Sequence, residues 1–249
     1  MRLSVLGAGP AYTDVYDSAG AAYLVMQGST SVLLDLGHGS FSRIFADRAP
    51  ESLDAVVISH LHPDHFVDLV PMRHYLRYEF SPPRRMRVLG PSGLDGRLDA
   101  LHAEPGFSAQ ALDTEVLGEV TRTIGALTIE SRKVWHTEES YAFRVSVAGS
   151  EAPGLVYSGD CGSIDDLAPL IHPGDALLVE VSFGVGPGPA GVAHLTGPQV
   201  GELAARTRPG RVLLTHILLH RDPEATRASV MARYDGPVSF VWPGTRLEL

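Results

Sequence analysis

The stretch SHLHPDH, residues 59–65, carries the strongest structural signal in this 249-residue chain. It continues the run AVVIS at 55–59, which is apolar and rich in β-branched residues and therefore predicts a buried strand. Pro63 fits the first turn of a helix, so we expect the chain to pass from this strand through a short loop into a helix. Binding and catalytic groups commonly gather at such strand ends. Four side chains of the stretch can bind metal, namely His60, His62, Asp64 and His65.

We assign these four side chains to two metal ions. The loop can direct His60 and His62 at a first ion, while Asp64 and His65 on the helix can face a second. Imidazole and carboxylate suit zinc or manganese, and two such ions about 3.5 to 4 Å apart can clamp the attacking and leaving oxygens of a displacement. The opposing interpretation is a solvated polar loop whose histidines are there by chance.

Two ions need further ligands, and three later segments supply them. His136 ends the run SRKVWH, Asp160 ends LVYSGD and His216 ends RVLLTH, so each β-like segment delivers a polar residue to one edge. A lone histidine is more often structural, but the three gain weight beside the first motif. The single cysteine, Cys161, excludes a cysteine-rich zinc site and an intramolecular disulfide. We interpret it as a buried thiol beside Asp160.

Composition predicts a folded protein with a sizeable core. Apolar residues make up 44% of the chain and charged residues 20%, which excludes intrinsic disorder. The formal net charge of −9 argues against binding nucleic acid by whole-molecule attraction. The first apolar run is interrupted by Gly7 and Gly9, and no run approaches the roughly 20 residues of a membrane span. We therefore expect a cytoplasmic protein without a membrane segment.

Strands lead each half of the chain and then alternate with helices, which predicts an α/β fold of two similar halves around one core. We expect a single domain over residues 1–249. Strands are predicted at 2–6, 21–26, 31–36, 55–59, 86–89, 115–120, 127–134, 141–147, 154–157, 176–181, 211–214, 238–241 and 245–249. Helices are predicted at 41–47, 66–79, 94–102, 164–171, 197–207 and 223–234.

The order HLHPDH, His136, Asp160 in SGD and His216 in LTH resembles the metallo-β-lactamase superfamily over nearly the whole chain. The resemblance implies a four-layer αβ/βα sandwich with the metals at one edge. It implies that Asp35 in LLDLG supports the site from behind without binding metal. It also implies a ligand set in which Asp160 bridges the ions, His60, His62 and His136 bind the first, and Asp64, His65 and His216 bind the second.

Two further strings, AHLTGPQVGELA at 193–204 and LLTHI at 213–217, resemble the ribonuclease Z and phosphodiesterase branch of that superfamily. There, a histidine in the position of His194 faces the scissile phosphate. This implies that a hydroxide bridging the metals attacks phosphorus, while the imidazolium stabilises charge or protonates the leaving alkoxide. Glu180 in VEVS is expected to hold His194 by a hydrogen bond. The predicted catalytic residues are thus Asp64 and His194.

Two departures from the tRNA nucleases favour a small substrate. Those enzymes carry a long basic arm between the positions of His136 and Asp160, where this chain has only a short hairpin. They also usually have a glutamate where the string DLGHG places His38. We therefore predict a compact phosphodiesterase for a cyclic nucleotide or a similar small phosphodiester, with two divalent ions, zinc first and manganese second.

Several alternatives stay open at this stage. A ribonuclease Z-like RNA 3′-end nuclease, or a lactone, ester or thioester hydrolase, would use the same ligands. A binding module that had lost its metals would lack ligands, and a diiron redox protein would usually replace a histidine ligand by a carboxylate. Five arginines form an RNA-docking edge or a solvated face: Arg73, Arg77, Arg84, Arg85 and Arg87. Four apolar residues belong to a homodimer contact or to the core: Met72, Tyr75, Leu76 and Phe80.

Overall fold

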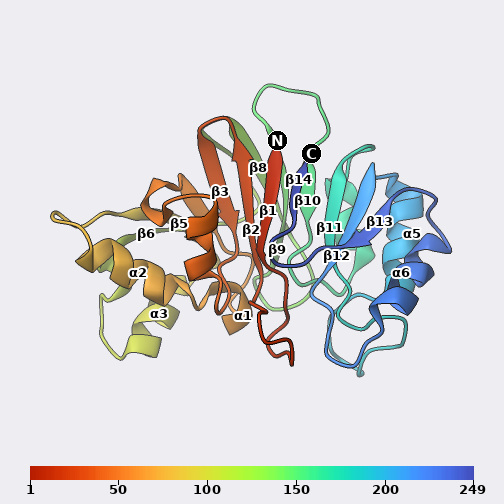
Figure 1. Ribbon diagram of the computed structural model, residues 1–249, viewed down its shortest axis with the longest axis horizontal. Coiled ribbons are helices and arrows are strands. Elements are labelled where there is room, and N and C mark those ends of the chain that lie inside the picture. Colours follow the sequence, from red (N-terminus) through yellow and green to blue (C-terminus); the bar gives the residue numbers. More distant parts are fainter.

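Two seven-stranded mixed sheets pack against each other in the computed structural model of residues 1–249 (Figure 1). The first sheet has the order β14-β1-β2-β3-β4-β5-β6 and the second the order β13-β12-β11-β10-β9-β8-β7. The first comprises β1 (Arg2–Gly7), β2 (Ala22–Gln27), β3 (Thr30–Leu34), β4 (Ala55–Val57), β5 (Met86–Gly90), β6 (Leu112–Val116) and β14 (Arg246–Glu248). The second comprises β7 (Thr121–Ile124), β8 (Leu127–Lys133), β9 (Tyr141–Val147), β10 (Leu155–Tyr157), β11 (Ala176–Glu180), β12 (Arg211–Thr215) and β13 (Val238–Phe240).

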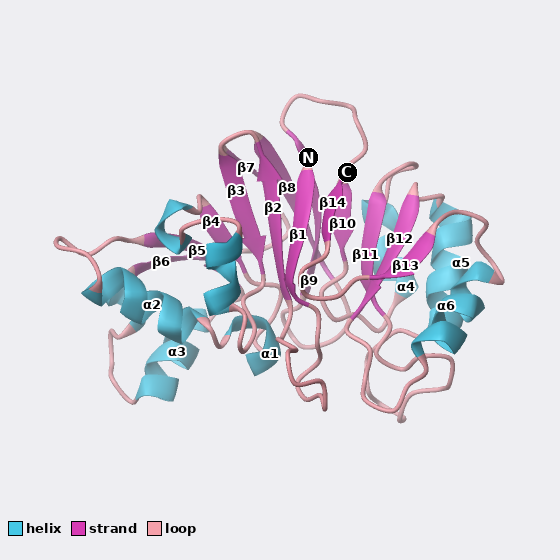
Figure 2. Cartoon of the chain, viewed as in Figure 1, coloured by secondary structure: helices cyan, strands magenta, loops and turns pink.

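Helices flank the sheets on both outer sides (Figure 2). On the first side lie α1 (Pro63–Phe66), α2 (Leu69–Tyr78) and α3 (Leu94–His102), and on the second α4 (Ile164–Leu167), α5 (Gly197–Thr207) and α6 (Pro223–Met231). Short 3-10 helices are η1 (Phe41–Ala46), η2 (Pro50–Ser52), η3 (Ser108–Gln110) and η4 (Ala168–Leu170). None of the helices combines the length and apolar character that crossing a bilayer would require.

Alternation along the strands produces three apolar layers between four layers of backbone. On β3, Val32 and Leu34 face the core between the two sheets, while Leu33 packs toward the helices of the first side. On β11, Leu178 faces the same central core and Leu177 packs toward the helices of the second side. Successive side chains of a strand point to opposite faces, so a fully apolar strand requires cover on both. The predicted α/β four-layer sandwich is confirmed.

The expectation that Pro63 starts one helix running on through 66–79 is wrong, because the chain forms two helices, α1 and α2, with a break after Phe66 that the sequence pattern did not show. The Asp68 N–H donates to the carbonyl of Leu36 at 3.1 Å, and the carbonyl of Asp64 accepts from the Ala21 N–H at 3.0 Å. Both groups would otherwise pair with each other in a continuous helix. A side chain at Gly37 would overlap the Asp64 carbonyl, so only glycine allows this close approach. At this break, backbone hydrogen bonds attach α1 to the segments next to β2 and β3.

The strand predicted at 115–120 is also wrong in its boundaries, and a strand was missed after it. The chain forms β6, turns through Gly118 at φ +66°, and then enters β7 at the edge of the other sheet. The segment EVLGEV at 115–120 has apolar residues on both sides of Gly118, so its pattern did not show the change of sheet. Smaller differences concern helix ends: 164–171 is α4 followed by η4, and α6 ends at Met231 instead of Tyr234.

Two residues considered for a homodimer contact belong to the core. Met72 and Leu76 on α2 are fully buried against the first sheet. Tyr75 and Phe80 remain partly accessible, and their rings pack edge to face with centroids 5.4 Å apart.

Candidate metal centre

The seven side chains predicted to bind metal gather at one edge of the two sheets. Five of them closely follow a strand, and two lie on α1, whose first residue is Pro63 as expected. Parallel strands of both sheets end there, so segments far apart in the sequence meet at this edge. The seven follow β4 (His60 and His62), β8 (His136), β10 (Asp160) and β12 (His216), or lie on α1 (Asp64 and His65).

These side chains form groups whose nitrogen and oxygen atoms lie within 4.8 Å of one another. The first group contains His60, His62, His136 and Asp160, and the second contains Asp64, His65 and His216. A third group joins Asp160 and His216 to His194. The sequence motifs therefore converge in space, and six of the chain's 11 histidines lie in one cluster.

Asp160 lies between the first two groups and directs one oxygen at each. Its Oδ2 is 3.8 Å from His60 Nε2 and 3.6 Å from His136 Nε2. Its Oδ1 is 3.4 Å from His65 Nε2 and 3.6 Å from His216 Nε2. These separations exceed a hydrogen bond, as expected for donors arranged around a common cation.

Three buried atoms that face the centre have no hydrogen-bond partner: His60 Nε2, His65 Nε2 and Asp160 Oδ1. Leaving a buried polar atom unsatisfied costs about 1 to 3 kcal/mol, so three such atoms in one place are suited to holding a cation. Imidazole and carboxylate together suit first-row divalent metals. The cluster fits, and is able to bind, metal ions.

The outer nitrogens of four of the five predicted histidine ligands are held by neighbours, which fixes their inner nitrogens toward the centre. Each donates from Nδ1 to an oxygen of the surrounding protein, an arrangement that typically orients metal-binding histidines. The pairs are His60 with Ser59 Oγ (3.1 Å), His65 with Asp35 Oδ2 (2.7 Å), His136 with the Ala193 carbonyl (2.8 Å) and His216 with Ser182 Oγ (3.0 Å).

Asp35 lies behind the centre as the resemblance implied, and it is fully buried. Besides His65, its carboxylate accepts hydrogen bonds from the Ser59 hydroxyl at 2.8 Å and the Tyr157 hydroxyl at 2.6 Å. Asp35 and His216 both have positive φ, +57° and +54°, where residues other than glycine are strained. The hydrogen bonds around Asp35 and His216 maintain this strain at the strand ends that place their side chains at the centre.

Burial and neighbouring charges give His60 and Asp64 the protonation states that metal binding requires, whereas, against the effect of burial, the charges of Asp160 and Asp35 raise the pKa of His65. Burial, reinforced by the adjacent His65, holds the pKa of His60 well below its usual range, so its imidazole is neutral. Burial alone would raise the pKa of Asp64, but the hydrogen bond with His216 and the charge of His65 lower it to about 2. Neutral imidazole and ionised carboxylate are the metal-binding forms of these groups.

Glu180 lies beside His194 at the end of β11, and its carboxylate is completely buried. His194 Nδ1 donates to Glu180 Oε1 at 2.8 Å and lies 3.3 Å from Ser182 Oγ, so the side-chain hydrogen bonds of His194 are all made at Nδ1. Burial alone would lower the pKa of His194, but the hydrogen bond to Glu180 and the charges of Glu180 and Asp160 raise it to about 8. Cys161 donates its backbone N–H to the same carboxylate, and burial raises the pKa of its thiol.

Sequence reasoning missed three residues that support the centre: Ser59, Tyr157 and Ser182. The Ser182 hydroxyl donates to Glu180 Oε2 at 2.5 Å and accepts from His216, so it connects the two. All three stand within quoted strings, SHLHPDH, LVYSGD and VEVS, next to or near a predicted site residue. The sequence signal that could have identified them is a polar residue next to a predicted ligand at the end of a strand.

The basic residues considered for RNA docking are largely engaged within the protein. Arg73 is buried, with its guanidinium 4.0 Å from the centroid of the Phe107 ring. Arg85 and Arg87 form ion pairs with acidic residues of β6, Asp113 and Glu115 respectively. Arg77 and Arg84 form no ion pair. His38 lies outside the three groups around the centre.

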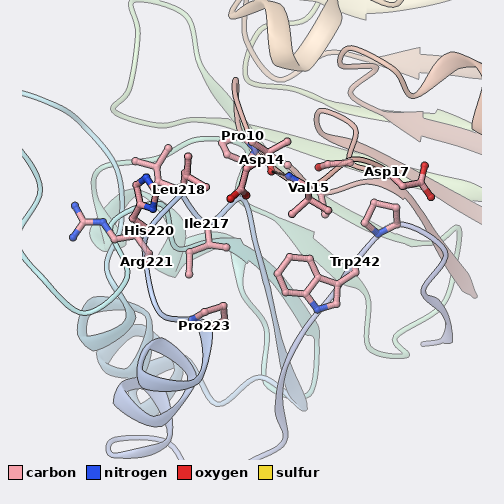
Figure 3. A pocket seen from close by; sticks show the side chains of 16 residues that line it. Pro10, Asp14, Val15, Asp17, Ile217, Leu218, His220, Arg221, Pro223 and Trp242 are labelled. Carbon is pink, nitrogen blue, oxygen red and sulfur yellow. Dashed lines mark hydrogen bonds between the residues drawn. The ribbon is translucent and has the colours of Figure 1, made fainter.

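Three cavities lie near the centre, one lined by Ile217, which follows His216 in the sequence, and the other two lined by His62 and His194. The first, of about 540 Å³, lies between the loop that carries Pro10 and Val15 and the segments that carry Ile217 and Trp242 (Figure 3). A second, of about 460 Å³, borders His62 and contains Arg97, Glu138 and Glu139. A third, of about 400 Å³, contains His194 and Trp135. Each offers room for part of a substrate.

A family model described as "Beta-lactamase superfamily domain" matches residues 30–217. Among curated proteins, the chain is 33% identical to Rv1339 of Mycobacterium tuberculosis over 97% of this chain and 89% of that protein. It is 26% identical to the probable metallo-hydrolase YhfI of Bacillus subtilis over 98% of this chain and all of YhfI.

Solved structures share the architecture. The crystal structure of YhfI, described as a metallo-beta-lactamase fold protein, aligns over 99% of each chain with a TM-score of 0.87 at 23% identity. The short form of human tRNase Z aligns over 100% of this chain and 99% of its own, with a TM-score of 0.73 at 19% identity. At these identities the likeness concerns the fold.

Proposed function

Because the chain belongs to the beta-lactamase superfamily, we propose that it is a metal-dependent phosphodiesterase that cleaves a cyclic nucleotide or a similar small phosphodiester. The protein would hold two divalent ions, zinc by preference. The unpartnered inner atoms of His60, His65 and Asp160 support this assignment. One ion would bind His60, His62 and His136, the other Asp64, His65 and His216, with Asp160 shared between them.

Divalent ions held in this way would activate a water molecule near neutral pH and neutralise charge on the phosphate oxygens. The protein's own residues have separate tasks. Asp64 is a buried carboxylate whose Oδ2 lies 3.3 Å from His216 Nε2. It therefore contributes negative charge and holds His216 in position. Asp35 and Ser182 orient the imidazoles from behind by accepting from their outer nitrogens.

The observation that carries the proposal is the placement of His194. Its Nδ1 is fixed by the buried Glu180, its Nε2 is free, and its ring lies beside Asp160 and His216 at the open side of the centre. A histidine held in this way can donate a proton from Nε2 to the oxygen that leaves phosphorus, which typically contributes about 10² to 10⁴-fold to the rate. Glu180 then stabilises the correct orientation of the ring.

A small substrate is favoured because the chain is acidic and most of the arginines considered for RNA docking are engaged within the protein. The net charge is −9, and Arg73, Arg85 and Arg87 are buried or paired. Long RNA needs many phosphate contacts, whereas a small phosphodiester needs only the metal centre and its walls. The alternative substrates to test are an RNA 3′ end and a carbonyl ester.

The first experiment is hydrolysis of 3′,5′-cyclic AMP by zinc- or manganese-loaded protein. Asp64→Ala serves as the metal-site control, with metal content measured for both proteins. We expect turnover by the wild type alone. Verified metal-loaded protein that leaves cyclic AMP intact but cleaves RNA ends, or lactones and thioesters, would overturn the small-phosphodiester assignment and leave a hydrolase of the same fold.

A further inference from the structure

The cavity beside His194 differs in chemistry from the other two. Apart from His194, no ionisable side chain lines it, whereas the cavity beside His62 contains Arg97 and two glutamates and that of Figure 3 contains two aspartates. A neutral wall suits an uncharged part of a substrate. This cavity also includes His194 itself, so whatever it holds lies next to the proposed proton donor.

Trp135 presents a large aromatic face at this cavity. Trp135 is 57% exposed, although its backbone is fixed by two hydrogen bonds. The Trp135 N–H donates to Asp166 Oδ2 at 2.9 Å, and its carbonyl accepts from the Gly162 N–H at 2.8 Å. An exposed tryptophan with a rigid backbone, one residue before the predicted ligand His136, is a ready surface for stacking a planar group.

The floor of the cavity is built by close packing of the loop that follows β11. The buried Phe183 ring packs edge to face on His194, with centroids 5.3 Å apart. A side chain at Gly188 would overlap that ring, and one at Gly162 would lie 2.7 Å from Ala193, so both glycines permit the loop to fold closely over the centre. The cavity is therefore a defined part of the site.

Gln199 supplies a directed polar group in the same cavity. Its Oε1 accepts from the Thr196 N–H at 3.0 Å and from the Thr196 hydroxyl at 2.8 Å, which caps α5. Since the oxygen is occupied in this way, the side-chain NH₂ group is free to donate. The cavity thus combines an aromatic face with a fixed amide donor, and both recognise the ring and the acceptor atoms of a nucleobase.

We propose that this cavity is a nucleobase subsite, in which the base of the substrate stacks on Trp135 and accepts a hydrogen bond from Gln199. The inference rests on the proposed phosphodiesterase function and names the part of the substrate that lies beside His194. It explains a neutral, aromatic cavity next to a centre that would otherwise bind any phosphodiester. Specificity for nucleotides then comes from this wall and the reaction from the metal centre.

The two tryptophans of the chain provide a direct test, because Trp135 and Trp242 line different cavities. In Trp242→Phe only Trp135 reports, and in Trp135→Phe only Trp242 reports. Zinc-loaded samples of both are titrated with adenosine, and with ribose as the control for the sugar. We expect adenosine, and not ribose, to quench Trp242→Phe while Trp135→Phe is unchanged. Quenching of Trp135→Phe alone would place the base in the cavity of Figure 3, and quenching of neither would exclude both.

Kinetics separate this inference from the proposed function. Trp135→Ala should raise KM for cyclic AMP about 5- to 150-fold, the range expected for losing one base–aromatic stack, with kcat and metal content retained. Trp135→Phe should recover most of the loss, and the cyclic phosphate of 1-deoxyribose, which lacks a base, should be unaffected by either change. An unchanged KM for cyclic AMP in Trp135→Ala would overturn the subsite while the phosphodiesterase stands. Adenosine quenching without turnover of any phosphodiester would support the nucleobase subsite and contradict the proposed phosphodiesterase activity.

Gln199→Glu tests the amide donor without removing the helix cap. Glutamate keeps the oxygen that Thr196 requires, so thermal stability should be retained. We expect the adenosine affinity of Gln199→Glu to fall about fivefold, since a hydrogen bond contributes roughly 1 kcal/mol. Unchanged affinity would remove Gln199 from the subsite.

Discussion

The metal centre has an inner half, around His65 and Asp35, and an outer half, around His62, His136 and His194. The two halves are supported in different ways. In the inner half, His65 is completely buried and bonded to Asp35, which also binds Ser59 and Tyr157 through side chains. In the outer half, His62 is exposed and His136 is attached to a backbone carbonyl of the loop ending at Ala193. Fixed side-chain bonds position the ligands precisely, while a loop can vary its shape with the substrate.

Tyr157 shows how the inner half joins the two sheets. It lies on β10 of the second sheet, and its hydroxyl donates to Asp35 after β3 of the first. Its ring packs against Tyr23 of β2 with centroids 4.8 Å apart. The centre is thus built into the central core on one side and remains accessible on the other. Substitutions in the centre test this contrast, and one outside the centre serves as a reference.

Asp160→Ala should have the largest effect, because Asp160 faces both groups of ligands. We expect loss of bound metal and turnover at background, beyond the roughly 10² to 10⁴-fold that losing one proton-transfer group costs. Metal analysis and initial rates measure both quantities. Asp165→Ala is the matched control, since that carboxylate is exposed and pairs only with Arg206. Full metal content in Asp160→Ala would contradict its shared position.

His194→Ala should separate the reaction from metal binding in the outer half. Because His194 is held by Glu180 and not by the inner network, metal content and the melting temperature should be retained. The rate should fall about 10² to 10⁴-fold. Loss of metal in this variant would show that His194 is a ligand. The distinction between an inner and an outer half would then not hold.

Asp35→Asn should weaken the inner half specifically. Asp35 accepts on both oxygens, from the Ser59 N–H at Oδ1 and from His65, the Ser59 hydroxyl and Tyr157 at Oδ2. An asparagine has only one acceptor oxygen, so we expect metal affinity to fall about 10- to 100-fold. Competition with a chelator measures this. Glu180→Gln is the outer counterpart, which should lower the rate and keep the metal. Equal metal loss in both variants would remove the distinction between the halves.

Asp175→Asn tests acid stability away from the centre and should have the smallest effect. Burial would raise the pKa of Asp175, but hydrogen bonds from Arg144 and two backbone N–H groups lower it below its usual range. A depressed native pKa contributes stability above the unfolded pKa of about 3.9, and this is lost as pH falls through the native pKa.

We therefore expect Asp175→Asn to reduce the free energy of unfolding by about 1 to 3 kcal/mol at pH 7, with a smaller difference in strong acid. Urea denaturation across this pH range measures it. A difference that grew toward acid would reverse the sign of the inferred shift. Turnover at pH 7 should be unaffected, because the Arg144 pair lies outside the centre.

The sequence by itself determined which residues enter the centre and the kind of element that delivers them. Apolar runs that end in His60, Asp160 and His216 define strands and their polar ends, because burial and side-chain alternation act locally along the chain. The helices at Leu94–His102 and Gly197–Thr207 were predicted to the residue for the same reason, since their periodicity lies within one segment.

Only the tertiary structure decided which distant groups complete those elements. The break between α1 and α2 follows from the Leu36 carbonyl, the change of sheet at Gly118 from the position of β7, and the support of Asp35 from Tyr157. A buried polar group must bond to whatever neighbour the fold places beside it. That neighbour is set by strand order and sheet packing, which local sequence patterns do not contain.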